Sequence, residues 1–494
     1  GHTRATHTYP LTTRKNNVNP KIQKLNQSTS ETIVSWTSRI TLLSRDDRLA
    51  EAAREFSDMR LAGIEPNHIT FISLLSACGN FPSGSEALSD LLHGYACKLG
   101  LDRSHVMVGT AILGMYSKRG HVRKARLVFD YMEDKNSVTW NTMIDGYMRN
   151  GQVDNAVKVF DEMPERDLIS WTAMITGFVK KGFHEEALAW FREMQISGVN
   201  PDYVAIIAAL AACTNLGALS FGLWAHRYVV SQDFRNNVRV SNSLIDLYCR
   251  CGCVEFARQV FDTMEKRTVV SWNSVIVGFA ANGNANESLV YFRKMQEEGF
   301  KPDAVTFTGA LTACSHVGLV EEGFQYFQMM KTDYRISPRI EHFGCLVDLY
   351  SRAGRLEDAI KVVESMPMKP NEVVIGSLLA ACRNHGNHTI LAERLMKHIS
   401  DLDVKGHSNY VILSNMYAAD GKWEGASKMR RKMKGLGLKK QPGYSSIEID
   451  DYTHVFMAGD NAHVETAYIR EVLEVISYDL RLQGCVIASD LVDD

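Results

Sequence analysis

The chain has 494 residues, of which 45% are hydrophobic and 23% are charged, a balance that is typical of a folded protein and excludes a disordered or fibrous one. Because this length exceeds one ordinary domain, the chain must either divide into domains or grow by repetition. The formal net charge of −2 argues against a protein that holds nucleic acid by overall positive charge, and no apolar run approaches the roughly 20 residues that cross a bilayer.

Residues 1–32 form a basic leader that is rich in Thr, Ser and Asn and has no acidic residue before Glu31. This composition predicts the remnant of an organelle transit peptide. A disordered leader without a function would have the same composition, so that alternative stays open. The basic residues of the leader are Arg4, Arg14, Lys15, Lys21 and Lys24.

Internal repetition is the dominant feature of the chain. Seven segments, starting at residues 33, 106, 137, 168, 238, 269 and 340, align without gaps up to their position 27. Four of them have Trp at position 4, namely Trp36, Trp140, Trp171 and Trp272. All seven have Met at position 27, namely Met59, Met132, Met163, Met194, Met264, Met295 and Met366.

Three further positions of the repeat are nearly constant. Position 15 is Gly in six repeats and Asp47 in the first, where we expect a looser turn because glycine ends a helix at low steric cost. Position 20 is Ala except at Ser288, and position 24 is Phe except at Val363. The apolar positions have helical spacing, so each repeat is predicted to form two helices of about 12 residues joined by a short turn.

One hairpin of this kind cannot bury its own apolar faces, so neighbouring hairpins must stack into a superhelix. The small residue at position 20 would let the two helices approach closely, and Phe and Met would seal each hairpin against the next. Intervening repeats start at residues 68, 203 and 304, with a related segment at 372. Each has Ala followed by Cys at positions 10 and 11, ending in Cys78, Cys213, Cys314 and Cys382.

The intervening repeats explain four of the ten cysteines as small buried side chains. Cys249, Cys251 and Cys253 lack the paired spacing of common zinc sites, and Cys251 lies in an ordinary turn between helices. We therefore expect no metal and no other cofactor.

These residues resemble the pentatricopeptide repeat family, and specifically its plant subfamily in which repeats of about 35, 35 to 38 and 31 residues alternate. The resemblance covers nearly the whole chain. It implies an all-α, right-handed superhelical α-solenoid with a small mixed C-terminal extension. Ten repeats would occupy residues 33–371, starting at 33, 68, 106, 137, 168, 203, 238, 269, 304 and 340.

The same resemblance implies two E motifs in residues 372–439 and an E-plus-like extension in residues 440–494, without a deaminase domain. Members with this layout include chloroplast RNA-editing factors. A chloroplast location is therefore expected, with the mitochondrion as the alternative.

In the family, the fifth and last residues of a repeat contact the edge of one RNA base. Carried over to this chain, the reading residues are Thr37, Asn67, Thr110, Asn136, Asn141, Asp167, Thr172, Asp202, Asn242, Thr268, Asn273 and Asp303. An aliphatic residue at position 2 packs on the base face, which implies stacking by Val34, Met107, Val138, Ile169 and Val270.

The resemblance also implies which base each repeat reads. The repeats starting at 33 and 106 imply A, those at 137 and 269 imply U, that at 168 implies G, and that at 238 implies a pyrimidine. The other repeats are left unread, so the expected target contains 5′-A-N-A-U-G-N-Y-U-N-N-3′. Without the resemblance, Asn, Thr and Asp near helix starts would be interpreted as caps of free backbone N–H groups.

Basic residues recur at position 13 of the aligned repeats. They would either contact RNA phosphates or solvate the negative end of each first helix, and the sequence does not decide between these roles. The residues are Lys118, Arg149, Lys180, Arg250 and Arg352.

The sequence indicates no catalytic centre, and the chain is not expected to be an enzyme. A deaminase signature would need a His-X-Glu segment followed by a pair of cysteines. His463 and Glu465 have the first spacing, but only Cys485 follows, so we interpret them as the start of an amphipathic helix running to about Leu482.

The resemblance instead implies division of labour. The repeats would bind single-stranded organellar RNA four nucleotides before an edited cytidine. Residues 372–494 would recruit a deaminase-bearing editing protein and other editing cofactors. Two rivals remain at this stage: a factor for RNA stability, processing or splicing, and a protein-binding scaffold like the tetratricopeptide arrays.

Overall fold

The computed structural model describes residues 32–81, 85–232, 234–386, 389–400, 407–435, 444–449, 452–457 and 461–482. The leader expected in residues 1–32 lies, apart from Thr32, outside the described residues. The chain divides into two compact parts, residues 1–208 and 209–494. No helix of the described residues is long and apolar enough to cross a membrane.

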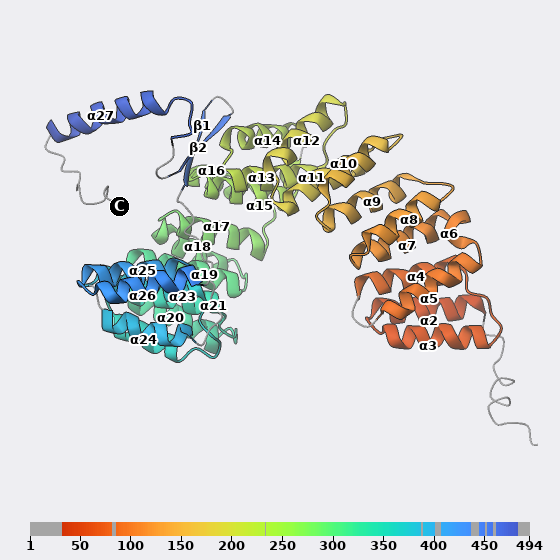
Figure 1. Ribbon diagram of the computed structural model, residues 1–494, viewed down its shortest axis with the longest axis horizontal. Helices are drawn as coiled ribbons and strands as arrows, with labels where there is room; N and C mark the ends of the chain where they lie inside the picture. Colours follow the sequence, from red (N-terminus) through yellow and green to blue (C-terminus); the bar gives the residue numbers. More distant parts are fainter. Residues whose placement is uncertain are drawn as a thin grey trace, which may run out of the picture. The chain divides into compact units, whose positions relative to one another are not determined.

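The N-terminal part consists of helices arranged as successive hairpins (Figure 1). Its first helices pack on one another in chain order, α2 on α4, α4 on α7, α7 on α9 and α9 on α11. The helices are α2 (Ile33–Arg45), α3 (Leu49–Leu61), α4 (His68–Asn80), α5 (Glu86–Lys98), α6 (Leu101–Ser104), α7 (Val106–Lys118), α8 (Val122–Tyr131), α9 (Ser137–Arg149), α10 (Val153–Glu162), α11 (Leu168–Lys181) and α12 (His184–Ile196), followed by α13 (Tyr203–Leu216) at the division.

The C-terminal part continues the same pattern, with α15, α17, α19, α21, α23 and α25 packed in chain order. Its helices are α14 (Leu219–Ser231), the short 3-10 helix η1 (Phe234–Asn236), α15 (Val238–Arg250), α16 (Val254–Asp262), α17 (Val269–Ala281), α18 (Ala285–Glu297), α19 (Ala304–Val317), α20 (Val320–Thr332), α21 (Ile340–Arg352), α22 (Leu356–Glu364), α23 (Glu372–Asn384), α24 (Thr389–Ser400), α25 (His407–Ala419), α26 (Trp423–Gly435) and α27 (Thr466–Leu482). The expected all-α solenoid of helix hairpins is confirmed.

A small mixed extension follows the hairpins. Strands β1 (Tyr444–Ile449) and β2 (Tyr452–Met457) form an antiparallel pair in which Tyr444 lies opposite Met457. Helix α27 follows them and begins at Thr466, three residues after His463. His463 and Glu465 therefore precede the helix that we expected them to start.

The turn between the two helices of a repeat depends on a left-handed backbone conformation. The six glycines at position 15 all have positive φ, between 73° and 83°. Asp47, which replaces glycine in the first repeat, adopts the same conformation with φ of 59°. The expectation of a looser first turn was wrong, because Asp is one of the few residues with a side chain that enters this region at modest cost.

Successive repeats are joined by an aromatic contact. The Phe at position 24 of one repeat meets the Trp at position 4 of the next edge-on, with 4.8 Å between ring centroids. This geometry is the preferred one for aromatic pairs. The pairs are Phe129 with Trp140, Phe160 with Trp171 and Phe261 with Trp272.

The residues at position 20 are fully buried where the two helices of a hairpin meet, as their small size predicts. Ser288, the exception to Ala, donates its hydroxyl to the carbonyl of Ile276 at 2.7 Å, which satisfies the polar group inside the core. The four repeated cysteines are buried, as expected, and no described cysteine forms a disulfide.

Candidate nucleic-acid interface

The first helix of a repeat buries one face and leaves its second residue exposed, except for the half-buried Val204. Val34, Met107, Val138, Ile169 and Val270, the predicted stacking residues, are between 58% and 66% exposed. Single exposed aliphatic side chains are ordinary on a protein surface. Here they recur at one position of the repeat, and this regular placement suits contact with an extended partner. The intervening repeats add three such residues that sequence reasoning missed, namely Ile69, Val305 and Val373. Their position in the repeat was the signal that could have found them.

The fifth residue of each repeat lies one turn further along the same helix, so it is inside the helix and not at its cap. Thr37 and Asn273 are 7% exposed, whereas Thr110, Asn141, Thr172 and Asn242 are half-buried. The fifth position therefore lies between the exposed second residue and the buried core.

In each of the six repeats whose fifth and last residues are predicted to read a base, the last residue caps the next first helix, whereas His105 and Arg339 make no such side-chain cap. Its side-chain oxygen accepts a hydrogen bond from the backbone N–H of the third residue of that helix, as between Asn136 and Thr139 at 3.0 Å. The capping alternative therefore holds for the last residues and fails for the fifth ones. The same geometry recurs at Asn67, Asp167, Asp202, Thr268 and Asp303.

A cap does not use all of the polar atoms of these side chains. Asp167 accepts the backbone N–H of Ser170 through Oδ1 only, and Asp202 accepts two backbone N–H groups through Oδ1 only. The second carboxylate oxygen of each accepts no hydrogen bond from the described residues. Such a side chain can hold the helix and contact a ligand at the same time.

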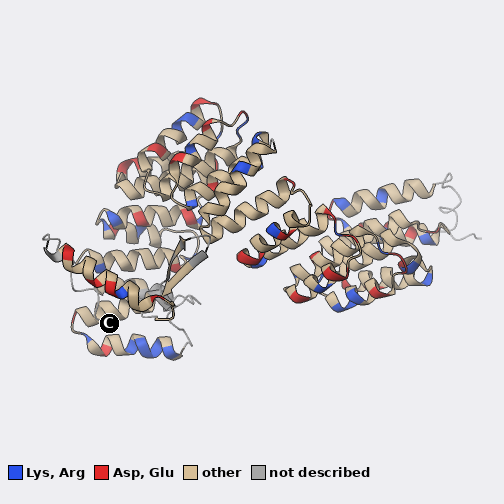
Figure 2. Ribbon diagram, turned by 90° about the horizontal axis from the view of Figure 1, so that it is seen from above, with Lys and Arg blue, Asp and Glu red and all other residues tan. Residues whose placement is uncertain are grey.

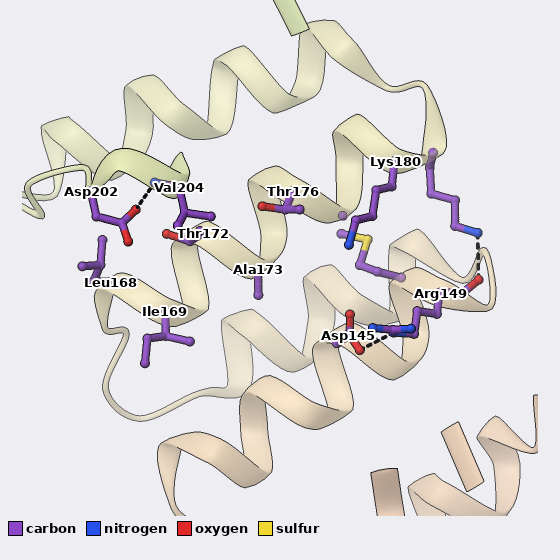
Figure 3. A pocket seen from close by; sticks show the side chains of 13 residues that line it. Asp145, Arg149, Leu168, Ile169, Thr172, Ala173, Thr176, Lys180, Asp202 and Val204 are labelled. Carbon is purple, nitrogen blue, oxygen red and sulfur yellow. Dashed lines mark hydrogen bonds and ion pairs between the residues drawn. The ribbon is translucent and has the colours of Figure 1, made fainter. Parts of the chain in front are cut away.

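Two adjoining pockets follow the first helices of the N-terminal part. The first, here called the Thr172 pocket, has a volume of about 510 Å³ and is lined by α9, α11 and the start of α13. Thr172 and Asp202 lie side by side at one end of it, and Arg149 and Lys180 lie at the other (Figure 3).

The second, here called the Asn141 pocket, has a volume of about 860 Å³ and is lined by α4, α7, α9 and α11. It shares Asp145, Arg149, Ile169 and Ala173 with the Thr172 pocket. The two pockets together contain a large share of the residues predicted from the sequence in this part of the chain. These are Met107, Val138, Ile169, Thr110, Asn136, Asn141, Thr172, Asp202, Lys118, Arg149 and Lys180.

The polar atoms of the fifth residues are in two different states. Thr37 and Thr110 each share a hydrogen bond with a buried Thr of the next repeat, at 2.9 and 2.8 Å, and Asn273 is bonded to Asp303. In contrast, the side-chain oxygens of Asn141, Thr172 and Asn242 are buried without a hydrogen-bond partner among the described residues. Buried polar atoms are rarely unpaired unless a ligand or water completes them.

The basic residues at position 13 are all exposed, but several have partners within the chain. Lys118 donates to Asn80 at 2.7 Å, Arg352 pairs with Asp348 at 2.8 Å, and Arg149 pairs with Asp145 one turn earlier. Arg250 faces Asp246, whose carboxyl pKa is raised by burial and lowered in part by that guanidinium. Lys180 has no such partner among the described residues, and it is the strongest candidate for a phosphate contact.

Charge is otherwise mixed along the helices. Figure 2, a ribbon coloured by residue type, shows acidic and basic residues interspersed along the helices of both parts of the chain, in agreement with the net charge of −2. Affinity for a nucleic acid must therefore come from individual, locally placed basic groups and from contacts to bases.

His463, the histidine of the His-X-Glu segment, is engaged in other contacts through both ring nitrogens. Nε2 of His463 lies 2.9 Å from Nδ1 of His454, and Nδ1 of His463 accepts the backbone N–H of Glu465. Cys485 lies outside the described residues. Within the described part of the chain, the cysteines at 249, 251 and 253 do not form a group that could share one ion.

One group that sequence reasoning missed does bring three ligand types together. Donor atoms of His93, Cys97 and Asp102 lie within 4.8 Å of one another. The Cys97 thiol donates to Asp102 at 3.2 Å, and Nδ1 of His93 meets the Tyr116 hydroxyl at 2.9 Å. Burial and Asp102 raise the pKa of Cys97 to about 11, which keeps the thiol protonated. The three groups already satisfy one another or a neighbour, so we assign no metal to them.

Comparison with known proteins follows the same repeats. The profile of the PPR repeat matches residues 110–137, 169–199, 240–269, 305–334 and 341–370, and that of the PPR repeat family matches residues 31–80, 135–169 and 267–316. The profile of the E motif matches residues 386–448, which overlaps the segment expected to hold E motifs.

A pentatricopeptide repeat-containing protein of Arabidopsis thaliana, named as chloroplastic, is 86% identical over 486 residues, 98% of this chain and 97% of that protein. Another Arabidopsis protein of the same description is 42% identical over 92% of this chain and 84% of its own length. The first of these relatives confirms the expected chloroplast location.

Among solved structures, the pentatricopeptide repeat protein PPR10 from maize matches with a TM-score of 0.62 and 20% identity, over 85% of this chain and 61% of that chain. The likeness is one of fold. PPR10 has also been solved in complex with an 18-nucleotide psaJ RNA element. Repeat profiles along the chain and nearly full-length identity to a named member lead to one conclusion: the chain belongs to the pentatricopeptide repeat family.

Proposed function

We propose that the chain binds single-stranded RNA, one nucleotide per repeat, along the first helices. The observation that carries this proposal is the regular placement of an exposed aliphatic side chain next to a polar pair in successive repeats. An aliphatic surface suits the flat face of a base, and the polar pair suits its hydrogen-bonding edge. A family member that binds RNA, maize PPR10, supports the assignment.

We further infer that the bound RNA is a chloroplast transcript and that the chain selects a cytidine for C-to-U editing. On this proposal residues 33–371 read the target, and residues 372–494 recruit a deaminase-bearing editing protein. The match to the E motif supports this division. The contacts of His463 also support it. Both ring nitrogens of this residue are occupied, one by His454 and the other by the backbone N–H of Glu465, so the His-X-Glu segment does not present a free histidine for catalysis.

The register of the proposal is tested by a compensatory exchange at one repeat. Thr172 and Asp202 are proposed to read G, whereas Asn with Asp is proposed to read U. The full-length chain should prefer 5′-A-N-A-U-G-N-Y-U-N-N-3′ over the same RNA with U in place of G by about ten-fold. The variant Thr172→Asn should reverse that preference, as measured by equilibrium binding of labelled RNA oligonucleotides.

Equal affinity of the parent chain for both RNAs would contradict the proposed assignment of this repeat to the G of the target. A salt titration distinguishes an RNA-binding protein from a protein-binding scaffold. Contacts to phosphates make RNA affinity fall as the salt concentration rises, whereas a protein-binding scaffold should have no such affinity. Editing is tested by adding the parent and the variant to chloroplast extract with matched and mismatched transcripts. Editing should follow the match at Thr172. Protection or splicing of the transcript without conversion of its cytidine would favour the stability, processing or splicing alternative.

A further inference from the structure

A buried hydroxyl in the next repeat contacts two of the three fifth-position threonines that are proposed to read bases. Thr37 Oγ1 lies 2.9 Å from Thr70 Oγ1, and Thr110 Oγ1 lies 2.8 Å from Thr139 Oγ1. Thr70 and Thr139 occupy the same place, the third residue of the following first helix, and both are completely buried. Neither was singled out by the sequence.

The direction of these hydrogen bonds follows from counting protons. Thr139 Oγ1 also lies 2.9 Å from Oδ1 of Asn136, and that oxygen accepts the backbone N–H of Thr139 at 3.0 Å. The backbone N–H fixes the orientation of the Asn136 amide, because it needs an acceptor there. A hydroxyl has one proton and Oδ1 can only accept, so Thr139 donates to Asn136 and must accept from Thr110.

Thr110 therefore donates its only hydroxyl proton to Thr139 inside the protein. Toward a base it can act only as an acceptor, while the Nδ2 hydrogens of Asn136 stay available as donors. The first repeat has the same chain of hydrogen bonds from Thr37 through Thr70 to Asn67, with Thr70 Oγ1 at 3.0 Å from Asn67 Oδ1. An acceptor beside a donor complements the amino group and N1 of adenine.

The repeat that starts at 168 lacks this chain of hydrogen bonds, here called the relay, among the described residues. The equivalent third residue is Ala205, which has no hydroxyl, and Thr172 Oγ1 is buried without a partner among the described residues. Thr172 thus keeps its proton for a ligand. Asp202 uses Oδ1 for the backbone N–H groups of Val204 and Ala205, which leaves Oδ2 as an acceptor. A donor beside an acceptor complements O6 and N1–H of guanine.

We propose that the third residue of the following repeat sets the hydrogen-bond polarity of the reading threonine. A threonine there turns the reader into an acceptor and favours adenine, and its absence leaves a donor and favours guanine. This inference rests on the proposed RNA-binding function and adds Thr70, Thr139 and Ala205 to the residues that determine specificity.

A serine at the third position does not form the relay. Ser170 Oγ donates instead to the backbone carbonyl of Asp167 at 2.7 Å, and Ser271 Oγ accepts the backbone N–H of Thr268 at 3.1 Å. The fifth residues that precede them, Asn141 and Asn242, keep an unpaired oxygen. In both of these repeats the reader is Asn and the serine makes no hydrogen bond to it among the described residues, so Ser170 offers a control.

The test uses the full-length chain and RNA oligonucleotides that carry A or G opposite the repeat starting at 106. Thr139→Val removes the hydroxyl with little change in shape, so Thr110 regains a free proton. We expect the preference for A over G at that nucleotide to fall by about five-fold, the size of one hydrogen bond. Ala205→Thr should lower the preference for G over A by a similar factor at the nucleotide that is read by the repeat starting at 168. Ser170→Ala should change neither preference.

Thermal melting of each variant shows whether it is folded, and the two opposite substitutions keep the test informative if one of them does not fold. An unchanged preference in folded Thr139→Val or folded Ala205→Thr, with the parent preference intact, would overturn the relay and leave the proposed function standing. A parent chain that shows no preference between A and G at either nucleotide would overturn both.

Discussion

Asn273 and Asp303, thirty residues apart in the chain, face each other across the step from α17 to α19. Nδ2 of Asn273 lies 3.0 Å from one carboxylate oxygen of Asp303 and 3.1 Å from the other. Oδ1 of Asp303 also accepts the backbone N–H groups of Val305 and Thr306. One carboxylate thus starts a helix and orients the fifth residue of the preceding repeat.

This double role predicts different results for two substitutions of Asp303. Asp303→Ala removes the cap and should lower the free energy of unfolding by about 1 kcal/mol, measured by urea denaturation. Asp303→Asn keeps an oxygen for the cap but adds an N–H donor, so it should leave stability nearly unchanged. In RNA binding, Asp303→Asn should shift the nucleotide read by this repeat from U, whose N3–H is a donor, toward C, whose N3 is an acceptor. Retention of the U preference in a folded Asp303→Asn variant would contradict the assigned role.

The exposed aliphatic residues should contribute to binding and not to folding. Ile169 lines both pockets and is 62% exposed, so Ile169→Ala should weaken RNA binding by about five-fold while the melting temperature stays within about one degree of the parent. Ile196 on α12 is 77% exposed but lines neither pocket, and Ile196→Ala is the matched control. Equal loss of affinity in both variants would mean that the position-2 residues have no special contact with RNA.

Close packing between first helices predicts an unusual response to Gly→Ala. A Cβ at position 278 would overlap Sγ of Cys249 and lie 2.8 Å from the Cβ of that residue. Gly278→Ala should therefore destabilise the chain by about 1–2 kcal/mol, because overpacking exceeds the gain in helix propensity. Gly94 on α5 has no atom within 4 Å of its Cβ direction, so Gly94→Ala should stabilise by about 0.5–1 kcal/mol. Urea denaturation of the two variants should give opposite signs.

Two half-buried histidines, His93 and His226, predict a loss of stability in mild acid. Burial lowers the pKa of His226, which lies 2.7 Å from the Tyr248 hydroxyl, and that of His93. As pH falls below the ordinary histidine value of 6.5, the unfolded chain binds protons that the native chain does not, so the native state loses stability. The melting temperature should fall between pH 7.5 and 5.5, and it should fall less in His226→Gln. An identical slope in both proteins would show that His226 does not contribute.

Much of this architecture could be read from local sequence. The starts of the first helices coincide with the starts of the sequence repeats, because helical spacing and turn residues are properties of neighbouring residues. The exposure of Ile169 and Val270 likewise follows from their place on the outward face of an amphipathic helix. Asp47 shows the limit of that reasoning, because its φ of 59° keeps the turn that we expected to loosen in the absence of glycine.

The amino-acid sequence by itself determined where the first helix of each repeat begins, which recurring repeat positions are buried and which side chains are candidates for reading a base. Only the tertiary structure decided the partners of those side chains: Thr37 meets Thr70, whereas Thr172 Oγ1 has no hydrogen-bond partner in the described part of the chain. The physical reason is the distance along the chain between the groups that interact. A helix is fixed by hydrogen bonds four residues apart, but the proton of a buried hydroxyl goes to whatever acceptor the neighbouring repeat places within about 3 Å.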